Sequence, residues 1–295
     1  MKALIFGATG QLGRELARSR WPEGWDTVFL NRRQADFTQP ELIKAAVFAH
    51  TPDIVINAAA YTAVDKAEDN EPLASAVNTI APGEIAEACD RLGVPLFHIS
   101  TDYVFDGCKA GPYVERDPIA PIGVYGRSKA LGEAAIRAAA PQHLILRTAW
   151  IFSPFGQNFV KTMLALAKTN DTVQVVADQF GSPSSAADIA NILVTLASRR
   201  KDLRFGTYHL TNTGTTSWYG LAQAIFDDLE VRSGVRPRCI PIPTAQYPTR
   251  ASRPLNSVLN CELFFDTFGL SMPRWQDALG KVLTELHGSE GEGSA

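Results

Sequence analysis

Short runs of hydrophobic residues alternate with amphipathic stretches through the first half of the chain. The runs predict strands, and the stretches predict helices between them. We expect strands over 2–6, 27–31, 53–60, 95–100 and 143–148, and helices over 12–20, 40–50, 78–93 and 128–140. Strands separated by helices require right-handed crossovers, which give a parallel sheet with helices on both faces. The pattern therefore predicts an α/β fold with a doubly wound parallel sheet.

The pattern loosens after about residue 150. We expect further helices over 158–168 and 186–200, short strands over 207–212 and 238–243, and a proline-rich extended loop over 241–257. We interpret residues 1–150 as the main domain and 151–288 mainly as a smaller C-terminal α/β domain, with a segment near 170–200 returning to the first. The polar, glycine-rich tail over 289–295 is expected to be disordered.

Composition and charge exclude several classes of protein. Of the 295 residues, 45% are hydrophobic and 20% charged, and the net charge of −3 provides no basic field for nucleic acid or an anionic membrane. The N-terminal apolar run is too short for a signal peptide, and no run approaches the roughly 20 residues that span a bilayer. The four cysteines and five histidines show no metal-ligand spacing. We expect a cytoplasmic protein with reduced thiols and no metal.

A glycine-rich turn, "FGATGQLG", directly follows the first predicted strand and carries Gly7, Gly10 and Gly13. Glycines permit a tight turn and the close approach of a pyrophosphate, while the start of the next helix offers free N–H groups. Turns also use glycine for purely conformational reasons. The position after the first strand of a βαβ series favours dinucleotide binding and hence a Rossmann-type domain.

The end of the second strand, "LNRRQADF", indicates which dinucleotide. An acidic residue there would bind the adenosine ribose of NAD, whereas arginine accommodates the 2′-phosphate of NADP. The segment has Asn31, Arg32 and Arg33 and no acid at the strand end. We predict NADPH, with use of NADH left open; the alternative is a solvated basic loop. Asp36 and Phe37 are candidates to hold the adenine.

Three polar residues form a candidate catalytic set. Thr101 and Asp102 follow the strand "PLFHI" and should emerge at the carboxyl edge of the sheet, and Tyr125 and Lys129 should share one helical face. Thr101, Tyr125 and Lys129 suit carbonyl reduction: the hydroxyl of Thr101 would hold the substrate oxygen and Tyr125 would transfer a proton. The ammonium of Lys129 and an oxidised nicotinamide would lower the tyrosine pKa by about three units, or roughly 4 kcal/mol. Tyr-x-x-x-Lys also arises by chance, but the glycine turn and the chain order favour catalysis.

These motifs resemble those of the extended short-chain dehydrogenase/reductases and, more narrowly, the dTDP-4-dehydrorhamnose reductases among them. The resemblance covers nearly the whole chain and includes "FGATGQLG", "STDYVFDG", "VYGRSKALGE" and "DQFGSPSSAADIA". The segments "AYTAVDKAE" and "STDYVFDG" are its most specific parts.

The resemblance implies roles for particular residues. It places the pyrophosphate against Gly10, Gln11 and Leu12, lines the cofactor with Ala60, Tyr61 and Thr62, and gives the nicotinamide ribose to Lys129. Tyr125 matches the proton donor of the family.

Substrate contacts are implied less specifically. Thr101 and Asp102 match positions near the sugar, and Trp150 matches a substrate contact, with core packing as the alternative. We add Arg253 as a candidate for the diphosphate, because guanidinium binds phosphate bidentately; the alternative is a surface arginine.

The reaction that the resemblance implies is NADPH-dependent reduction of the C4 keto group of dTDP-4-dehydro-6-deoxy-L-mannose to dTDP-L-rhamnose, the last step of dTDP-rhamnose biosynthesis for cell-surface polysaccharide. Two other functions stay open. One is a reductase or epimerase acting on another 4-keto-6-deoxy nucleotide sugar, and the other is a non-catalytic NADP-binding regulatory subunit.

A homodimer and a metal also follow from the resemblance. Some members of the family bridge a dimer through Mg²⁺ held by glutamates, and Glu15 and Glu285 fit that pattern. Ala187 stands where a further glutamate is expected, with Asp188 next to it. The sequence departs from the family's pattern there, so the resemblance does not carry the Mg²⁺ site and that kind of dimer over to this chain, and both stay open.

Overall fold

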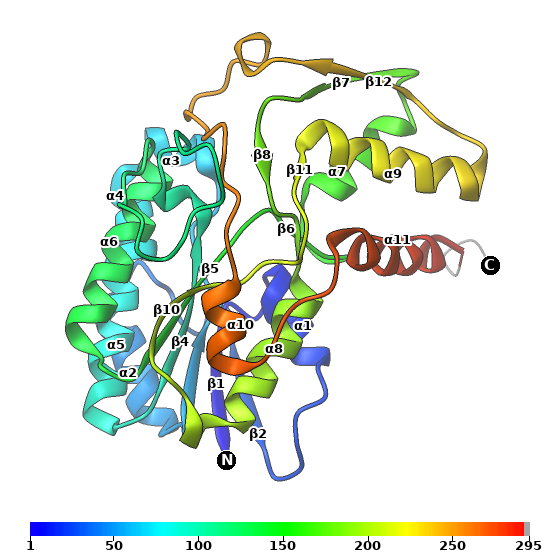
Figure 1. Ribbon diagram of the computed structural model, residues 1–295. Coiled ribbons are helices and arrows are strands. Elements are labelled where there is room, and N and C mark those ends of the chain that lie inside the picture. Colours follow the sequence, from blue (N-terminus) through cyan, green and yellow to red (C-terminus); the bar gives the residue numbers. More distant parts are fainter. Residues whose placement is uncertain (292–295) are drawn as a thin grey trace.

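A parallel sheet of six strands forms the centre of the computed structural model, which describes residues 1–291 (Figure 1). Its order is β10-β5-β4-β3-β1-β2, and every neighbouring pair is parallel. The strands are β1 (Lys2–Phe6), β2 (Asp26–Leu30), β3 (Ile54–Asn57), β4 (Leu96–Thr101), β5 (His143–Thr148) and β10 (Gly206–His209). The order reverses between β1 and β3, so a crevice is expected beyond the carboxyl ends of the strands there.

Helices cover both faces of the sheet (Figure 1). One face carries α1 (Gln11–Arg18), α8 (Ala186–Ser198) and α10 (Glu262–Phe268); the other carries α2 (Pro40–His50), α5 (Ala81–Leu92) and α6 (Val124–Ala139). In β1, Ala3 and Ile5 pack under α1 and α8, while Leu4 and Phe6 pack under α2 and α5. Alternate side chains point to opposite faces, and both faces are apolar because both are buried. The predicted doubly wound sheet is confirmed.

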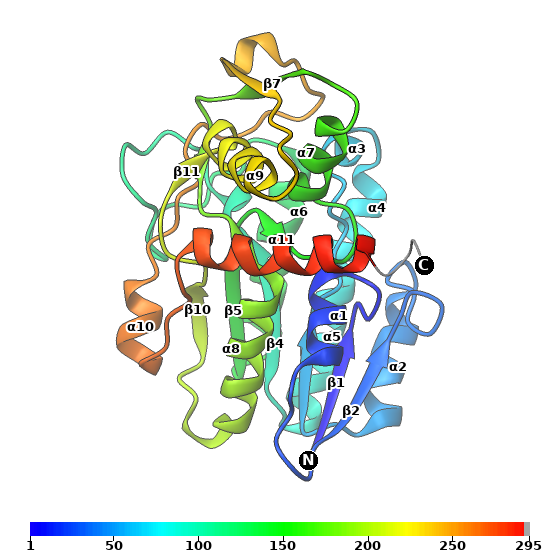
Figure 2. The same cartoon turned by 90° about the vertical axis from the view of Figure 1, so that its right-hand side faces the viewer.

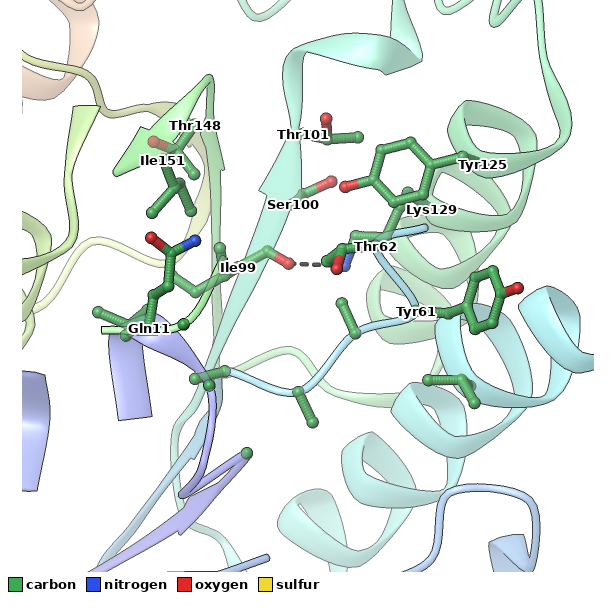
Figure 3. Close-up of a pocket in the computed structure, with 18 of the residues that line it drawn as sticks. Gln11, Tyr61, Thr62, Ile99, Ser100, Thr101, Tyr125, Lys129, Thr148 and Ile151 are labelled. Carbon is green, nitrogen blue, oxygen red and sulfur yellow. Dashed lines mark hydrogen bonds between the residues drawn. The ribbon is translucent and has the colours of Figure 1, made fainter. Parts of the chain in front are cut away.

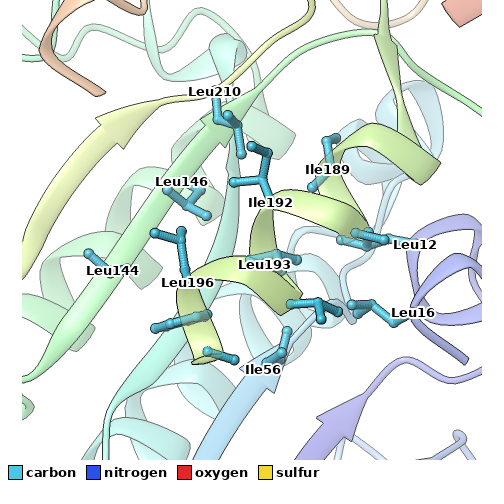
Figure 4. Packing of buried hydrophobic residues seen from close by; sticks show 14 of the residues in the cluster. Leu12, Leu16, Ile56, Leu144, Leu146, Ile189, Ile192, Leu193, Leu196 and Leu210 are labelled. Carbon is cyan, nitrogen blue, oxygen red and sulfur yellow. The ribbon is translucent and has the colours of Figure 1, made fainter. Parts of the chain in front are cut away.

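The core under α8 shows how this packing is built (Figure 4). Leu193 of α8 and Leu16 of α1 lie over Ile56 of β3, and Leu144 and Leu146 extend the same layer along β5 (Figure 4). Burying each aliphatic side chain of this kind contributes about 1.5–3 kcal/mol. The glycine turn between β1 and α1 is thus anchored on both sides by buried residues.

A smaller part lies beyond the carboxyl ends of the sheet. It comprises α7 (Phe159–Ala167), α9 (Trp218–Ser233), α11 (Trp275–Gly291) and the parallel pair β7 (Thr172–Val176) and β12 (Arg238–Ile242). A separate apolar cluster holds these elements together, with Val160, Phe226 and Leu283 among its buried members. Figure 2 shows α11 running across the molecule between α9 and the six-stranded sheet.

Short elements connect these parts. They are α3 (Val64–Asp69), α4 (Glu71–Ser75), the π-helix η1 (Ala76–Ile80), η2 (Asp102–Val104), β6 (Ile151–Phe152), β8 (Phe180–Gly181), β9 (Ser184–Ser185), η3 (Arg200–Asp202), β11 (Thr216–Ser217) and η4 (Thr244–Gln246). β6 pairs with β9 and β8 pairs with β11, so segments around 151 and 217 meet those around 180–185.

Of the segment near 170–200 that we expect to return to the main sheet, the part that does so is α8, over 186–198. β7 pairs with β12 in the smaller part, and the return begins at α8 and continues through β10, which adds the sixth strand beside β5. Tyr208 of β10 is buried because it packs edge-on against Phe264 and Phe268 of α10. This partner comes from far along the chain.

At the C-terminus, α11 runs to Gly291, into the tail expected over 289–295. Residues 292–295 lie outside the described part of the chain. No helix between residues 1 and 291 is both long and apolar enough to cross a membrane.

Candidate active site

A cavity of about 740 Å³ opens at the carboxyl ends of β1, β3, β4 and β5. Its volume is typical of a ligand site, and it occupies the crevice that the strand order predicts. The smaller part supplies the opposite wall through Trp150, Gly156, Gln157, Asn158 and Trp218. A ligand in this cavity would therefore contact both parts of the molecule.

The glycine turn forms the floor at one end. Gly7 has a φ of +90°, and a Cβ on it would lie 2.7 Å from the backbone nitrogen of Ala59. A Cβ on Gly13 would collide with the carbonyl oxygen of Gly7, so this glycine lets α1 pack onto the turn. Gly7, Gly10, Gln11 and Leu12 line the cavity, whereas Gly13 does not.

The start of α1 fits a pyrophosphate. Its N-cap, Gly10, provides no side-chain cap, so the first N–H groups of the helix remain available to a ligand. The absence of a Cβ at Gly7 and Gly10 leaves the backbone accessible. These features fit the cofactor that the sequence predicts.

Asn31, Arg32, Asp36 and Phe37 line the far end of the cavity, where the sequence places the adenosine. Phe37 is buried edge-on against Phe6, with ring centroids 5.5 Å apart. The Arg32 side chain is 77% exposed, and its Nε lies 3.9 Å from the Asp36 carboxylate, so it is free to turn toward a ligand. Hydrogen bonds from the backbone and side chain of Thr38 hold the pKa of Asp36 below its ordinary value.

Ala60, Tyr61 and Thr62 form one side of the cavity. A buried asparagine, Asn78, holds them: its Oδ1 accepts from the Tyr61 backbone at 2.8 Å, and its Nδ2 lies 3.1 Å from the Tyr61 carbonyl. Asn78 also donates to Ser128 of α6 at 3.0 Å. It belongs to the π-helix η1, and π-bulges are frequent at functional sites.

Tyr125, Lys129 and Thr101 meet in the same cavity, as predicted (Figure 3). Figure 3 shows Tyr61, Thr62 and Tyr125 on one side, and Gln11, Thr148 and Ile151 on the other. Burial raises the pKa of Tyr125 to about 12, and its hydrogen bond with Thr101 opposes the rise. The lower tyrosine pKa expected beside the ammonium of Lys129 and an oxidised nicotinamide stays a prediction; in the protein alone, burial has the largest effect on the pKa of Tyr125.

Lys129 is buried beneath Tyr125. Its Nζ donates to the Ile99 carbonyl at 2.7 Å (Figure 3) and lies 3.1 Å from Nε2 of His98. Burial lowers the pKa of Lys129 to about 8, while the charge of Glu133 acts in the opposite direction. The amine therefore exchanges its proton close to neutral pH.

Thr101 and Asp102 are bonded to each other in the structure. The Thr101 hydroxyl donates to Asp102 Oδ1 at 3.0 Å, and its oxygen accepts from the Tyr103 backbone at 3.2 Å. Burial raises the pKa of Asp102 to about 7. A protonated Asp102 could instead donate to Thr101 and release the threonine proton toward a substrate.

Two buried oxygens at the cavity have no hydrogen-bond partner among the described residues, Asp102 Oδ2 and Thr148 Oγ1. Buried polar atoms are rarely left unpaired, and an unpaired one needs a reason. A polar ligand in the cavity would provide the missing partners.

Asp102 makes stability depend on pH with a predictable sign. Its pKa is raised in the folded protein, so the protonated carboxyl favours folding. This contribution to the free energy of unfolding is complete below about pH 4 and is lost as the pH rises through 7. The wild type should therefore lose up to roughly 4 kcal/mol of its free energy of unfolding from Asp102 between pH 4 and pH 8. Asp102→Asn does not titrate at this position, so its stability relative to the wild type should rise by that amount over the same range. Urea unfolding at both pH values measures this. Asp106→Asn is the matched control, because the pKa of Asp106 is lowered and that variant should show no such gain.

Trp150 lies at the cavity wall. Its ring stacks on Trp218 of α9 with centroids 3.5 Å apart and an interplanar angle of 6°. Its φ of +47° is unusual for a non-glycine residue, and such backbone strain clusters at functional sites. It also packs against the apolar cluster of the smaller part, so both interpretations of Trp150 describe part of its surroundings.

Arg253 does not line the cavity. Its guanidinium pairs with the Asp65 carboxylate, with Nη2 and Oδ2 2.7 Å apart, and it hydrogen-bonds Tyr103, which does line the cavity. A role in binding the diphosphate stays a prediction, and it would require Arg253 to exchange its present partner.

Two residues that line the cavity, Asn158 and Trp218, were not predicted from the sequence. Asn158 donates to Gln11 Oε1 at 2.9 Å and caps α7, which joins the smaller part to the glycine turn. Trp218 opens α9 directly after the capping serine Ser217. The only sequence signal for either was a helix-start pattern, which does not reveal what the helix end faces.

The carboxylates considered for Mg²⁺ do not fit a metal. Arg18 lies between Glu15 and Glu285 and pairs with both, so a cation already occupies that position. Asp188 accepts from Asn212, and Ala187 offers no ligand. Across residues 1–291, no group of three or more His, Cys, Asp or Glu could hold a metal ion.

Comparison with known proteins identifies the family. The RmlD substrate binding domain family matches residues 1–287. A dTDP-4-dehydrorhamnose reductase from Burkholderia thailandensis is 45% identical, over 97% of this chain and 99% of its own. The chain belongs to the dTDP-4-dehydrorhamnose reductase family. The resemblance seen in the sequence motifs is thereby confirmed.

Solved structures agree with this family. A dTDP-4-dehydrorhamnose reductase from Clostridium acetobutylicum has a TM-score of 0.91 at 36% identity and covers 97% of this chain and 100% of its own. One from Bacillus anthracis, in complex with NADP, has a TM-score of 0.90 at 35% identity and covers 96% and 99%. The Bacillus anthracis relative thus carries NADP on the same fold.

Proposed function

We propose that this protein reduces the C4 keto group of dTDP-4-dehydro-6-deoxy-L-mannose with NADPH and forms dTDP-L-rhamnose. The observation that supports this most is the meeting of Tyr125, Lys129 and Thr101 at the carboxyl edge of the sheet. They share one cavity with a glycine turn that fits a pyrophosphate. Family membership supports the identity of the sugar nucleotide.

The residues that would hold the cofactor follow from the cavity. The start of α1, from Gly10, would bind the pyrophosphate, and Arg32 would bind the 2′-phosphate. Lys129 would bind the nicotinamide ribose. NADPH supplies a hydride to the C4 carbon when it is bound.

Tyr125 supplies the proton. With a pKa near 12 it is fully protonated at neutral pH, and it is still a stronger acid than an ordinary alcohol. It can therefore donate its phenolic proton to the C4 oxygen as negative charge develops there. Carbon gains the hydride and oxygen the proton, so the ketone becomes a secondary alcohol and the phenolate regains a proton from solvent through its polar neighbours.

Thr101 orients the same oxygen. Its hydroxyl now donates to Asp102, and the raised pKa of Asp102 makes a switch of donor accessible near neutral pH. When Asp102 carries the proton, Thr101 can point its own proton at the C4 oxygen.

The proposal is tested by following nicotinamide absorbance with dTDP-4-dehydro-6-deoxy-L-mannose generated in situ, with NADPH and NADH in parallel. We expect oxidation of NADPH and dTDP-L-rhamnose as the product. Folded protein that is silent with both cofactors would contradict it. Oxidation with another 4-keto-6-deoxy nucleotide sugar would support a different reductase, and firm NADPH binding without turnover on any such sugar would support the regulatory subunit.

Arg32 should determine the preference for NADPH. Arg32→Ala should raise the KM for NADPH about tenfold, the loss expected for one charge-assisted phosphate contact, and change the KM for NADH by less than about twofold. Initial rates with both cofactors measure this. Arg33→Ala is the control, because Arg33 does not line the cavity. Equal effects on both cofactors would contradict the role of Arg32.

A homodimer and a cytoplasmic location are further proposals. The resemblance supports the first, and the free cysteines, with no disulfide among residues 1–291, suit the second. Light scattering in solution would show a mass twice that of one chain.

A further inference from the structure

A buried histidine that the proposed mechanism does not use lies directly beside Lys129. His98 on β4 is fully buried and does not line the cavity. Its Nε2 is 3.1 Å from Lys129 Nζ and its Nδ1 is 3.1 Å from Nδ2 of Asn57 on β3. Asn57 and His98 are partners in the register of β3 and β4, so the sheet itself aligns this row of polar groups.

The hydrogen bonds of this row all run the same way, from Ala59 through Asn57 to His98. The backbone N–H of Ala59 donates to Asn57 Oδ1 at 3.1 Å, which sets the amide so that Nδ2 faces His98. Turning the amide over would place its NH₂ against the N–H of Ala59, with two donors facing each other. Asn57 therefore donates to Nδ1 of His98.

His98 carries a single ring proton. Burial is the main cause that lowers the pKa of His98 well below its ordinary value, so the imidazole is neutral. A neutral ring has one N–H, and Nδ1 is occupied as an acceptor, so the proton lies on Nε2. Nε2–H points at Lys129 Nζ.

An ammonium group has donors only, whereas an amine has a lone pair that can accept. The N–H of His98 is therefore favourable only for the amine form of Lys129, whose remaining hydrogens still allow the bond to the Ile99 carbonyl.

Other charged groups do not reverse this effect. Besides Lys129, the titratable groups on the neighbouring elements are Tyr125, Arg127, Glu133 and Arg137 on α6, Asp102 and Tyr103 on η2, and His143 and Arg147 on β5. Glu133 favours the ammonium form, but Arg147 binds both its oxygens, at 2.9 and 2.7 Å, and Ser100 and Arg137 bond to it as well. Much of its charge is already compensated.

We infer that His98 is a positioning residue that donates a hydrogen bond from Nε2 to Lys129, so that the row Ala59–Asn57–His98 favours the uncharged amine of this lysine. The use of such an amine rests on the proposed function. In the proposed reduction, Tyr125 gives its phenolic proton to the substrate. A lysine that gains and loses a proton near neutral pH can then return a proton to Tyr125 through the polar groups between them.

The tautomer of His98 is the first test, and it needs neither cofactor nor activity. In unliganded protein labelled with ¹⁵N in its histidine rings, the His98 signals are assigned by their loss in His98→Phe. We expect a protonated Nε2 and an unprotonated Nδ1. The opposite tautomer, or a ring with both nitrogens protonated, would overturn the inference. This measurement on the wild type stands even if His98→Phe fails to fold, because His98→Gln provides the same assignment.

The titration of Lys129 is the second test. It is followed by ¹³C NMR of labelled lysines, with the signal assigned by Lys129→Met. In His98→Phe the pKa of Lys129 should rise by about one unit, because one hydrogen bond to the amine is lost. If Lys129 instead donated to His98, the same variant would lower that pKa, and this result would overturn the inference.

His143→Phe is the matched control. His143 is also buried but lies outside the cavity lining, with Nδ1 against the Ala140 carbonyl. Its replacement should leave the titration of Lys129 unchanged. An inactive wild-type protein with the expected tautomer would defeat the proposed function and leave this inference intact.

Discussion

Replacing Tyr125 with phenylalanine should lower kcat by about 10²–10⁴-fold, the range that general acid catalysis contributes, and change the affinity for NADPH by less than about threefold. The substitution removes only the phenolic oxygen. Without it, the developing alkoxide keeps the Thr101 hydroxyl as a hydrogen-bond donor but loses the group that transfers a proton to it. Single-turnover rates and cofactor titration by fluorescence separate the two effects.

Tyr208→Phe is the control for this variant. Tyr208 also has a buried ring, and its hydroxyl donates to the Arg204 carbonyl at 2.9 Å, away from the cavity. Its loss should leave kcat within about twofold of the wild type, as for most changes outside a site. Near wild-type turnover in Tyr125→Phe would show that the proton comes from elsewhere.

Gly13→Ala should destabilise the whole protein, with the free energy of unfolding reduced by about 3 kcal/mol or more. The added methyl group would collide with the carbonyl oxygen of Gly7, which is backbone and cannot rotate away. To relieve the collision, α1 must move off the turn between β1 and α1. Denaturant unfolding measures the loss, and NADPH binding should weaken with it.

Gly10→Ala separates folding from binding. A Cβ at Gly10 would meet only the Gly7 carbonyl oxygen, at 3.4 Å, so the fold should lose less than about 1 kcal/mol. The methyl group would instead project where the pyrophosphate must approach the backbone, and the affinity for NADPH should fall about tenfold or more. Equal destabilisation by both alanines would contradict the distinct roles of the two glycines.

The parts of the fold that could be predicted are those with local causes. β1 is apolar along its length because both of its faces are buried, and this pattern is visible in residues 3–6 alone. Gly7, Gly10, Tyr125 and Lys129 could be found because turn geometry and helical spacing act over a few neighbouring residues. Their cavity then follows from the parallel sheet, which brings strand ends to one edge.

The remaining features depend on partners far apart in the sequence. β10 is a strand of the main sheet because it hydrogen-bonds to β5 and packs against α10. The raised pKa of Tyr125 comes from burial, which no local motif reveals. Trp150 meets Trp218 only through the packing of the smaller part, and His98 gains its direction from Asn57 on the next strand. Arg253 finds Asp65 across 188 residues of chain, so a phosphate role inferred from its side chain alone overlooked a competing partner.

The central claim is that this protein transfers a hydride from NADPH to C4 of the sugar and that the hydride remains on the product, with no return to the cofactor. We would supply NADPH carrying deuterium at C4 of the nicotinamide, on either face in turn, with dTDP-4-dehydro-6-deoxy-L-mannose, and examine the sugar by NMR. One of the two cofactors should give dTDP-L-rhamnose with one deuterium at C4, in amounts equal to the NADPH consumed. A sugar without deuterium, or an epimer formed with no net loss of NADPH, would contradict the claim.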